Sequence, residues 1–306
     1  MKKKEDEVPY KFESLSAVHQ ALGLPKPLHP LISLVNNTNN EIEYSRLPNS
    51  NILNFYKISY RINLSGKVKY GQGYYDFNEG GLLFAAPDQL IGSTDYGGDH
   101  SGYSLLIHPD LLWSSSLAKK IKQYSFFSYS ANEALHLSEQ EKATILSIFK
   151  LIEEELNSRI DDFSQDVIIS QIELLLNCCN RFYKRQFITS EVLNNDILQR
   201  MEEILDDYFK NGQSLIKGTP TVQYLSEHLT VSPGYLSDML RTLTGQSAQQ
   251  HIHNKIIEQA KEKLSTTKLS VSEIAYELGF ERQQSFSTLF KAKTDLSPLE
   301  FRQSFN

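Results

Sequence analysis

The hydrophobic pattern of this chain changes its period once, near residue 137. Before that point the chain holds short runs in which apolar and polar residues alternate. In ISYRINLSG, for example, Ile58, Tyr60 and Ile62 alternate with polar residues. Such alternation is typical of a strand with one buried face. After residue 137 the apolar residues recur every three or four positions, which is the period of an amphipathic helix. The sequence therefore predicts an α+β protein with a strand-rich first part and a helical second part.

The strand-rich part holds several further short runs. YGQGYYDF, GGLLFAAP and YSLLIHP follow ISYRINLSG, and turn signals at 78–80 and 97–99 separate them. Closely spaced short strands with glycine turns are typical of an antiparallel sandwich or barrel. We expect this structure over residues 30–110.

Two long helices are predicted after the strands. Ser138 and Glu141 form a capping box, and an apolar stripe at helical spacing follows it. A second helix is expected over 164–184, with apolar residues on more than one side. Burial within a single domain and contact between two subunits both remain open for this helix. Its apolar residues are Ile168, Ile169, Ile172, Leu174, Leu175, Leu176, Cys179 and Phe182.

Length and composition favour a soluble protein with two domains. The chain has 306 residues, of which 40% are hydrophobic and 22% charged. No run approaches the roughly 18 apolar residues of a membrane helix, and the start MKKKEDEVPYK lacks the apolar core of a signal peptide. The adjacent Cys178 and Cys179 are expected to be small buried residues in a reducing compartment. We therefore expect a cytoplasmic protein with no membrane contact.

The segment TPTVQYLSEHLTVSPGYLSDMLRTLTGQS predicts two helices joined by a short turn. Thr219 and Pro220 open the first helix. Ser232 and Pro233 start the second, with proline at the first helical position, where its missing N–H costs nothing. Gly245 ends it in the left-handed conformation. The residues expected to be buried are Val222, Leu225, Leu229, Leu236, Leu240 and Leu243.

The stretch SVSEIAYELGFERQQSFSTLFKAKTDLSP predicts the same arrangement a second time. Ser270 and Glu273 form a capping box, Gly279 turns the chain, and Ser297 with Pro298 opens a last short helix. The helix after the turn is expected to bury Phe286, Leu289 and Phe290, and to expose Arg282, Gln283, Gln284, Ser285, Thr288 and Lys291.

One helix over residues 248–264 is expected to connect the two units. At 1.5 Å per residue it spans about 26 Å. A rigid spacer of that order can set two recognition helices about one DNA turn (~34 Å) apart, so that both enter successive major grooves.

The C-terminal stretch holds one extended pattern of residues: Gly279, Phe280, Phe286, Phe290, Lys291, Ser297, Pro298, Phe301 and Arg302. This pattern resembles the C-terminal signature of the AraC/XylS family of bacterial transcription regulators. SPGYLSDMLRTLTGQS likewise resembles the first recognition helix of that family. The resemblance covers about ninety residues and implies a bihelical, seven-helix DNA-binding domain.

The resemblance also implies which residues contact DNA. Glutamine suits a bidentate contact with adenine, and serine or threonine suits either base type. The recognition helices would be residues 232–244 and 282–293. Base contacts would fall on Gly234, Ser237 and Asp238 in the first helix, and on Gln283, Gln284, Ser285 and Thr288 in the second.

Two of these residues depart from the family pattern. Many relatives carry a basic or amide residue where this chain has Asp238, and arginine often aligns with Thr288. An aspartate cannot sit against phosphate, although it can accept a hydrogen bond from cytosine. We therefore expect the first helix to contribute less to base recognition. Phosphate contacts are expected from Ser232, Arg241, Arg282 and Lys291.

The strands and helix pair of the first part resemble, more loosely, the cupin-like sensor domain common in this family. The expected fold is an N-terminal antiparallel β-barrel with a helix pair, followed by an all-α domain with two helix-turn-helix units. We expect a sensor and dimerisation domain at 1–185, a linker at 186–196 where the helical pattern is lost, and a DNA-binding domain at 197–306.

The resemblance implies partners as well. These are double-stranded DNA, a second copy of the chain, a small-molecule effector and, for an activator, RNA polymerase. Aromatic residues of the first part either line an effector pocket or belong to the core, and both readings remain open. They are Phe55, Tyr56, Tyr60, Tyr74, Tyr75 and Trp113.

Charge gives the strongest argument for a different function. From Thr219 to Asn306 nine Lys or Arg residues stand against nine Asp or Glu, so this segment is neutral, whereas DNA-binding domains are usually basic. The alternative is a protein-interaction or small-molecule-binding module with weak or no DNA binding. A neutral domain can still bind DNA if its cations share one face, which we expect for Arg241, Lys255, Arg282, Lys291 and Lys293.

No motif indicates an enzyme or a metal centre. His100 and His108 stand alone among the strands, and His251 and His253 point to different sides of the connecting helix. The sequence has no nucleophile elbow, P-loop or GxGxxG motif. We expect no catalytic residue, no metal ligand and no cofactor.

Overall fold

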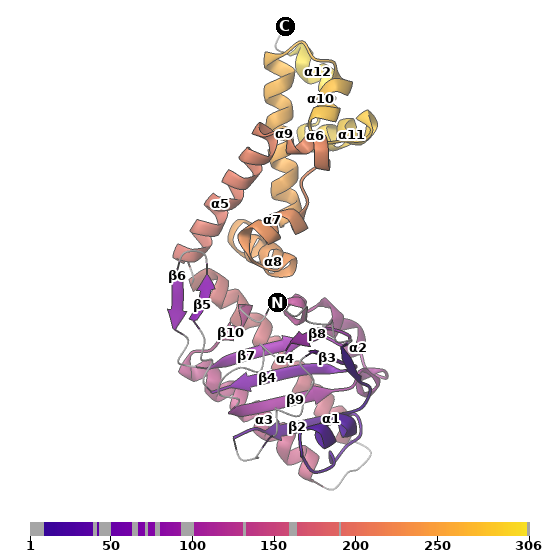
Figure 1. Ribbon diagram of the computed structural model, residues 1–306, viewed down its shortest axis with the longest axis vertical. Helices are drawn as coiled ribbons and strands as arrows, with labels where there is room; N and C mark the ends of the chain where they lie inside the picture. Colours follow the sequence, from indigo (N-terminus) through magenta and orange to yellow (C-terminus); the bar gives the residue numbers. More distant parts are fainter. Residues whose placement is uncertain are drawn as a thin grey trace, which may run out of the picture. The chain divides into compact units, whose positions relative to one another are not determined.

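The computed structural model describes residues 9–38, 42, 50–62, 67–70, 73–76, 80–92, 101–130, 133–158, 164–189 and 191–304. The chain forms two compact units, Met1–Gln186 and Phe187–Asn306 (Figure 1). All described strands belong to the first unit, and the regular elements described in the second are helices. The expected α+β composition is therefore confirmed. The helix pair that follows the strands belongs to the strand-rich unit, except for the last turn of its second helix.

The main sheet of the first unit has five antiparallel strands in the order β10-β7-β4-β9-β2. Ile58 and Tyr60 of the central strand are buried, as the alternation predicts. Ser59 is also buried, and its hydroxyl lies 3.5 Å from that of Ser104 on β9. Ile62 lies beyond the end of β4 and is exposed, contrary to the alternation. The strands are β2 (Ile32–Asn36), β4 (Tyr56–Arg61), β7 (Gly81–Ala85), β9 (Gly102–Ile107) and β10 (Leu135–His136).

Two smaller sheets complete the described strands. One has the order β1-β3-β8, in which β1 and β3 are parallel, and the other is the hairpin β5-β6. The three sheets are separate, so the described strands do not show a closed barrel. The strands are β1 (Tyr10–Phe12), β3 (Ser50–Leu53), β5 (Lys67–Tyr70), β6 (Gly73–Asp76) and β8 (Leu90–Gly92).

A compact apolar cluster lies beside the β1-β3-β8 sheet. Phe12, Leu53 and Phe55 are buried in it, together with Leu15 of helix α1 (Leu15–Ala21) and Leu106 of β9. Leu106 lies on the opposite face of β9 from Leu105 and Ile107, which are also buried. The main sheet is therefore buried on both faces at this strand.

Helices α3 (Glu139–Asn157) and α4 (Ser164–Thr189) follow the strands (Figure 1). The capping box of Ser138 and Glu141 is confirmed, and Phe149 of α3 stacks on Tyr103 of β9 with ring centroids 5.6 Å apart. Helix α4 extends beyond the expected end at 184, and Leu174 on its outer side is exposed. Short helices precede α3: η3 (Pro109–Leu112), α2 (Leu117–Lys120), η4 (Ile121–Gln123) and η5 (Ser125–Ser128).

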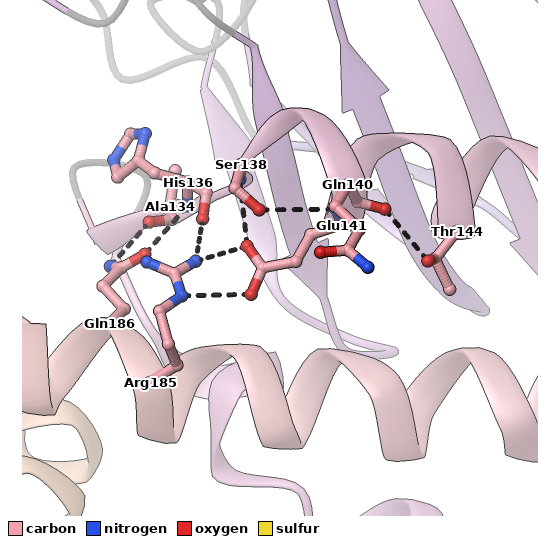
Figure 2. A network of polar contacts seen from close by, with 8 residues as sticks. All are labelled: Ala134, His136, Ser138, Gln140, Glu141, Thr144, Arg185 and Gln186. Carbon is pink, nitrogen blue, oxygen red and sulfur yellow. Dashed lines mark hydrogen bonds and ion pairs between the residues drawn. The ribbon is translucent and has the colours of Figure 1, made fainter.

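A polar network joins the C-terminal part of α4 to β10 and to the start of α3 (Figure 2). Both guanidinium nitrogens Nε and Nη2 of Arg185 donate to the carboxylate of Glu141, at 3.0 and 2.7 Å, and Nη2 also donates to the His136 carbonyl at 2.6 Å. Gln186 accepts from the His136 N–H at 2.8 Å and donates to the Ala134 carbonyl at 3.2 Å. Burial, and then the Arg185 charge, lowers the pKa of His136 to about 4. The imidazole is therefore neutral near pH 7.

The second unit holds two long helices, α5 and α9, and shorter helices arranged along α9 (Figure 1). Helices α7 and α8 lie toward one end of α9, and α10, α11 and α12 toward the other. The helices are α5 (Glu191–Lys210), α6 (Gln213–Lys217), α7 (Val222–Leu229), α8 (Pro233–Thr244), α9 (Ala248–Thr266), α10 (Val271–Glu277), α11 (Gln283–Thr294) and α12 (Pro298–Gln303).

The segment 186–196 differs from its prediction, because α4 continues to Thr189 and α5 begins at Glu191. The interruption of the helical period in the sequence is therefore short and does not separate the two helices by a long linker. From Ile197 onward Met201, Leu205 and Tyr208 are buried on one side of α5, which explains why this segment is helical. The domain boundaries themselves stay a prediction.

Candidate nucleic-acid interface

The first helix-turn-helix unit is formed by α7 and α8. Thr221, and not Thr219, caps α7, and its hydroxyl accepts from the Tyr224 N–H at 3.1 Å. The chain turns at Thr230, which adopts a left-handed conformation with φ 61°. Ser232 caps α8, Pro233 occupies its first turn, and Gly245 ends it with φ 75°, as the sequence predicts.

Helix α8 is held in place by a buried stripe. Tyr235, Leu236, Met239 and Leu240 are buried, whereas Leu243, expected in the same stripe, is half-buried. The stripe fixes which face of α8 points outward.

The candidate base-contacting residues of α8 are only partly accessible. Gly234, Ser237 and Asp238 are half-buried. Asp238 Oδ1 accepts from Arg241 Nη1 at 3.2 Å, and the Arg241 side chain is 61% exposed. Ser232 is buried, and its hydroxyl accepts from the Tyr235 N–H. This face of α8 therefore presents one internally paired cation and little accessible polar surface.

The second helix-turn-helix unit is formed by α10 and α11. Ser270 and Glu273 form the predicted capping box, which lowers the pKa of the Glu273 carboxyl through hydrogen bonds from Ser270. Gly279 turns the chain with φ 89°. A Cβ at Gly279 would lie 2.3 Å from the carbonyl carbon of Gly218, so the turn and the segment before α7 pack backbone to backbone. Ser297 and Pro298 open α12 as predicted.

The candidate base-contacting residues of α11 form an exposed polar row. Phe286 and Phe290 are fully buried, and their rings lie 5.8 Å apart. Leu289, expected to be buried, is half-buried. None of the row's side chains is hydrogen-bonded to another described residue, so their donors and acceptors face solvent. The row consists of Gln283, Gln284, Ser285 and Thr288, and the phosphate candidates Arg282, at the N-cap of α11, and Lys291 are exposed beside it.

The sequence prediction for Lys255 is wrong. Its side chain is 10% exposed, and its Nζ lies 2.8 Å from Asp206 of α5 and 3.1 Å from Glu258. Burial acts to lower the pKa of Lys255, but the hydrogen bonds to these two carboxylates outweigh it and raise the pKa. Lys255 therefore joins α5 to α9 instead of facing a partner.

Lys293 is held by a second contact with α9. Its Nζ donates to Asn254 Oδ1 at 3.0 Å, and Asn254 donates in turn to Gln246 Oε1 at 2.8 Å. No local sequence pattern predicts this network, because its three residues are spread over almost fifty positions. Of the five cations expected on one face, Arg241, Arg282, Lys291 and Lys293 remain candidates.

The histidines of α9 make ordinary side-chain contacts. His251 Nε2 lies 2.9 Å from Thr244 Oγ1, and His253 Nε2 lies 2.8 Å from Gln249 Nε2. Burial lowers the pKa of both rings. Within the described residues no three His, Cys, Asp or Glu side chains are grouped as metal ligands. His100 lies outside the described residues.

The strand-rich unit, Met1–Gln186, holds a cavity that the sequence did not predict. It has a volume of about 260 Å³, and Lys57, Arg61, Glu133 and Tyr183 are among the residues that line it. Of the aromatic residues considered as ligand contacts, Phe55, Tyr56 and Tyr60 are buried in the core and Trp113 is 79% exposed. The side chains of Tyr74 and Tyr75 lie outside the described part of the chain. The local signal for this cavity was the polar residues Lys57, Ser59 and Arg61 at alternate positions of β4.

No helix among the described residues is both long and apolar enough to span a membrane.

Comparison with known proteins points to one class of domain. The family model described as a helix-turn-helix domain matches residues 225–304. The arabinose operon regulatory protein of Escherichia coli is 30% identical over 131 residues, which are 38% of this chain and 44% of that protein. Its counterpart from Salmonella typhimurium is 37% identical over 38% of this chain and 46% of that protein.

One relative matches over most of its length. It is the uncharacterized HTH-type transcriptional regulator YfiF of Bacillus subtilis, 24% identical over 82% of this chain and 77% of that protein. The chain spans less than half of the length of the two arabinose regulators. The residues matched by the family model, 225–304, lie in the helical unit Phe187–Asn306.

Proposed function

Because residues 225–304 form an AraC-type helix-turn-helix domain, we propose that the protein is a transcriptional regulator that binds two successive major-groove segments of DNA. The observation that carries the proposal is the exposed polar row of α11. Its four side chains suit base edges, and three of them, Gln284, Ser285 and Thr288, lie on the side of the helix opposite the buried Phe286 and Phe290.

Base recognition is assigned mainly to α11 in this proposal. Gln283 and Gln284 offer amide groups that pair with adenine in two hydrogen bonds, and Ser285 and Thr288 offer hydroxyls. On α8, Gly234, Ser237 and Asp238 contribute less, because they are half-buried and Asp238 is paired with Arg241.

Phosphate contacts are assigned to Arg241, Arg282 and Lys291, whose side chains are exposed. Ser232 is retained as a fourth, weaker candidate because its hydroxyl already caps α8. The contacts to phosphate position the domain, and the contacts to bases give it specificity.

Helix α9 supports the spacing that the proposal needs. Its 19 residues span about 28 Å at 1.5 Å per residue. Both α8 and α11 contact α9, so their separation is fixed by one rigid element. A spacing near one helical turn of DNA (~34 Å) lets both helices enter the same side of a duplex.

The first unit completes the proposed regulator. We assign to it a cupin-like sensor function and, through its helix pair, homodimerisation in the cytoplasm. Leu151 of α3 and Val167 and Leu174 of α4 are apolar and exposed, which supports a partner for these helices. An activator would also contact RNA polymerase. We assign the protein no catalytic activity.

Binding of duplex DNA tests the proposal. Sequences selected in vitro from a random library should bind the full chain much more tightly than a shuffled duplex, and affinity should fall steeply with salt, by about 0.9 per phosphate contact in log–log slope. A single affinity for all duplexes, or affinity independent of salt, would favour the protein-interaction module that the neutral charge suggests.

A further inference from the structure

We propose that α11 recognises the 5-methyl group of a thymine that lies within about two base pairs of the adenine assigned to Gln284. This inference rests on the proposed function, since it names the base pairs that the second helix-turn-helix unit selects. The contact is assigned to the methyl group of Thr288, with Ala292 one turn further along the helix. The DNA segment bound by α11 therefore has A·T pairs at its centre.

The rotation of α11 about its own axis is fixed by a row of aromatic rings. Phe286 and Phe290 are fully buried on its inner side, with ring centroids 5.8 Å apart. The ring of Phe286 also lies 5.6 Å from that of Phe280, before the helix. The ring of Phe290 lies 5.4 Å from that of Phe301 on α12. Packing on the inner side thus determines which side chains of α11 point outward.

Three exposed residues form a line along the outer side of α11. Gln284, Thr288 and Ala292 follow one another at a spacing of four residues. Residues four apart lie on the same face of a helix, and at 1.5 Å per residue they are about 6 Å apart along its axis. The line changes from an amide to a side chain with a hydroxyl and a methyl group, and then to a methyl group alone.

Thr288 differs from three other threonines of the two helix-turn-helix units. The hydroxyls of Thr242, Thr244 and Thr294 each donate to the carbonyl of the residue four positions earlier. The hydroxyl of Thr288 makes no such bond to a described residue, and its side chain is exposed. Thr288 can therefore offer both a hydroxyl and a methyl group to a base.

The residue types of this line favour A·T pairs over G·C pairs. In the major groove an A·T pair presents the thymine 5-methyl group, which alanine and the methyl group of threonine contact. Guanine is read by arginine or lysine instead, and the line contains neither. The nearby cations Arg282, at the N-cap of α11, and Lys291 are assigned to phosphate above.

The spacing along the helix sets the position of the thymine. Bases of one DNA strand follow one another at about 3.4 Å. The roughly 6 Å between Gln284 and Thr288 therefore covers about two base-pair steps. Burial of one methyl group corresponds to an affinity gain of about fourfold, which is the size of the effect to be measured.

Selection of DNA tests the identity of the base pairs. The full chain would select duplexes from a random library, and the positions read by α11 are those at which Gln284→Ala loses selectivity. We expect an A·T pair at these positions and a second A·T pair within two base pairs of it. G·C pairs at the neighbouring positions would overturn the inference.

Removal of the methyl group from the DNA tests the contact itself. Deoxyuridine pairs as thymidine does and lacks only the 5-methyl group. Replacing the thymine of the second A·T pair by uracil should weaken binding of the full chain about three- to fivefold in fluorescence anisotropy. The same replacement outside the two contacted segments is the control and should leave affinity unchanged. Equal affinities for the thymine and uracil duplexes would contradict the contact.

Two substitutions separate the methyl group of Thr288 from its hydroxyl. Thr288→Ser keeps the hydroxyl and should reduce the uracil penalty to less than twofold, because both changes remove the same contact. Thr288→Val keeps a methyl group and should retain the penalty. Thr294→Ser is the matched control on the same helix, because the hydroxyl of Thr294 is bonded to the Phe290 carbonyl at 2.8 Å. An undiminished penalty in Thr288→Ser would refute the assignment to this residue.

The same measurements separate this inference from the proposed function. A chain that binds every duplex with one affinity overturns both. Selective binding without a uracil penalty overturns the thymine contact alone and leaves the assignment as a DNA-binding regulator intact.

Discussion

The two helix-turn-helix units share one turn but build it from different residues. In each turn an N–H bonds to a carbonyl five residues earlier: Val231 to Ser226 at 3.0 Å and Phe280 to Ala275 at 2.9 Å. This bond is typical of the Schellman motif, which requires a left-handed residue. That residue is Thr230 in the first unit and Gly279 in the second.

The difference has a cause outside the turns. Gly279 packs against the backbone of Gly218, where no side chain fits. Thr230 is exposed and caps its helix with a β-branched side chain in a conformation that costs such residues about 1–2 kcal/mol. The second turn therefore packs against a neighbouring segment, whereas the left-handed residue of the first turn is exposed.

The two recognition helices also differ in how far their candidate base-contacting residues are exposed. The α11 row is exposed, whereas the corresponding residues of α8 are half-buried and include Asp238 paired with Arg241. We infer from this contrast that the second helix-turn-helix unit carries most of the base recognition and that the first helix-turn-helix unit mainly positions the domain.

The largest expected effect tests the turn of the second unit. Gly279→Ala should destabilise the domain by about 2–5 kcal/mol, because left-handed strain adds to overpacking against Gly218. Gly245→Ala is the matched control: its φ of 75° is similar, but nothing lies within 4 Å of the added Cβ. It should cost only the left-handed strain, about 1–2 kcal/mol. Urea unfolding of the full chain, with hydrogen exchange in α10 and α11, measures both, and equal losses would refute the packing argument.

The next effect compares the two recognition helices directly. Gln284→Ala should weaken binding to the selected DNA site by about 1–3 kcal/mol and leave binding to unrelated DNA unchanged. Ser237→Ala on α8 should cost less at the same site. Fluorescence anisotropy with labelled duplexes measures these changes, and a larger loss for Ser237→Ala would reverse the comparison.

A third substitution should stabilise the first helix-turn-helix unit. Thr230→Gly relieves the left-handed strain of about 1–2 kcal/mol, and the greater freedom of glycine in the unfolded chain offsets part of this gain. We expect a net stabilisation of roughly 0.5–1 kcal/mol. Thermal unfolding checks the sign, and a destabilised variant would show that the Thr230 side chain makes a contact that outweighs its backbone strain.

The smallest effect concerns phosphate contacts. Lys291→Ala should weaken binding to every duplex alike, by under about 1 kcal/mol, and reduce the salt slope by about 0.9. Lys255→Ala should leave the salt slope unchanged, since Lys255 is paired with Asp206 and Glu258. Affinity titrations between low and physiological salt measure the slopes. A reduced slope for Lys255→Ala would place that lysine at the DNA surface after all.

The sequence predicted the features whose causes are local. Capping boxes such as Ser138 with Glu141 and Ser270 with Glu273 lie within four residues, and the buried Phe286 and Phe290 follow from helical spacing. The exposed row of α11 follows in turn from that burial. These signals need no knowledge of distant segments.

The features that the sequence did not predict depend on distant pairs. Lys255 looked like a surface cation because its partner Asp206 lies almost fifty residues earlier, on a helix whose start was taken for a linker. The cavity depends on Tyr183 reaching Glu133, and no local pattern links them. The alternating pattern likewise predicted where strands lie in the sequence but not their arrangement into three sheets.

The most direct test of the account is interference footprinting on a selected DNA site. Purine methylation in the major groove should block binding of the full chain at two clusters about 10 bp apart on one side of the duplex, and Gln284→Ala should abolish only the cluster contacted by α11. A single cluster, two clusters on opposite sides of the duplex, or a pattern unchanged by Gln284→Ala would contradict it.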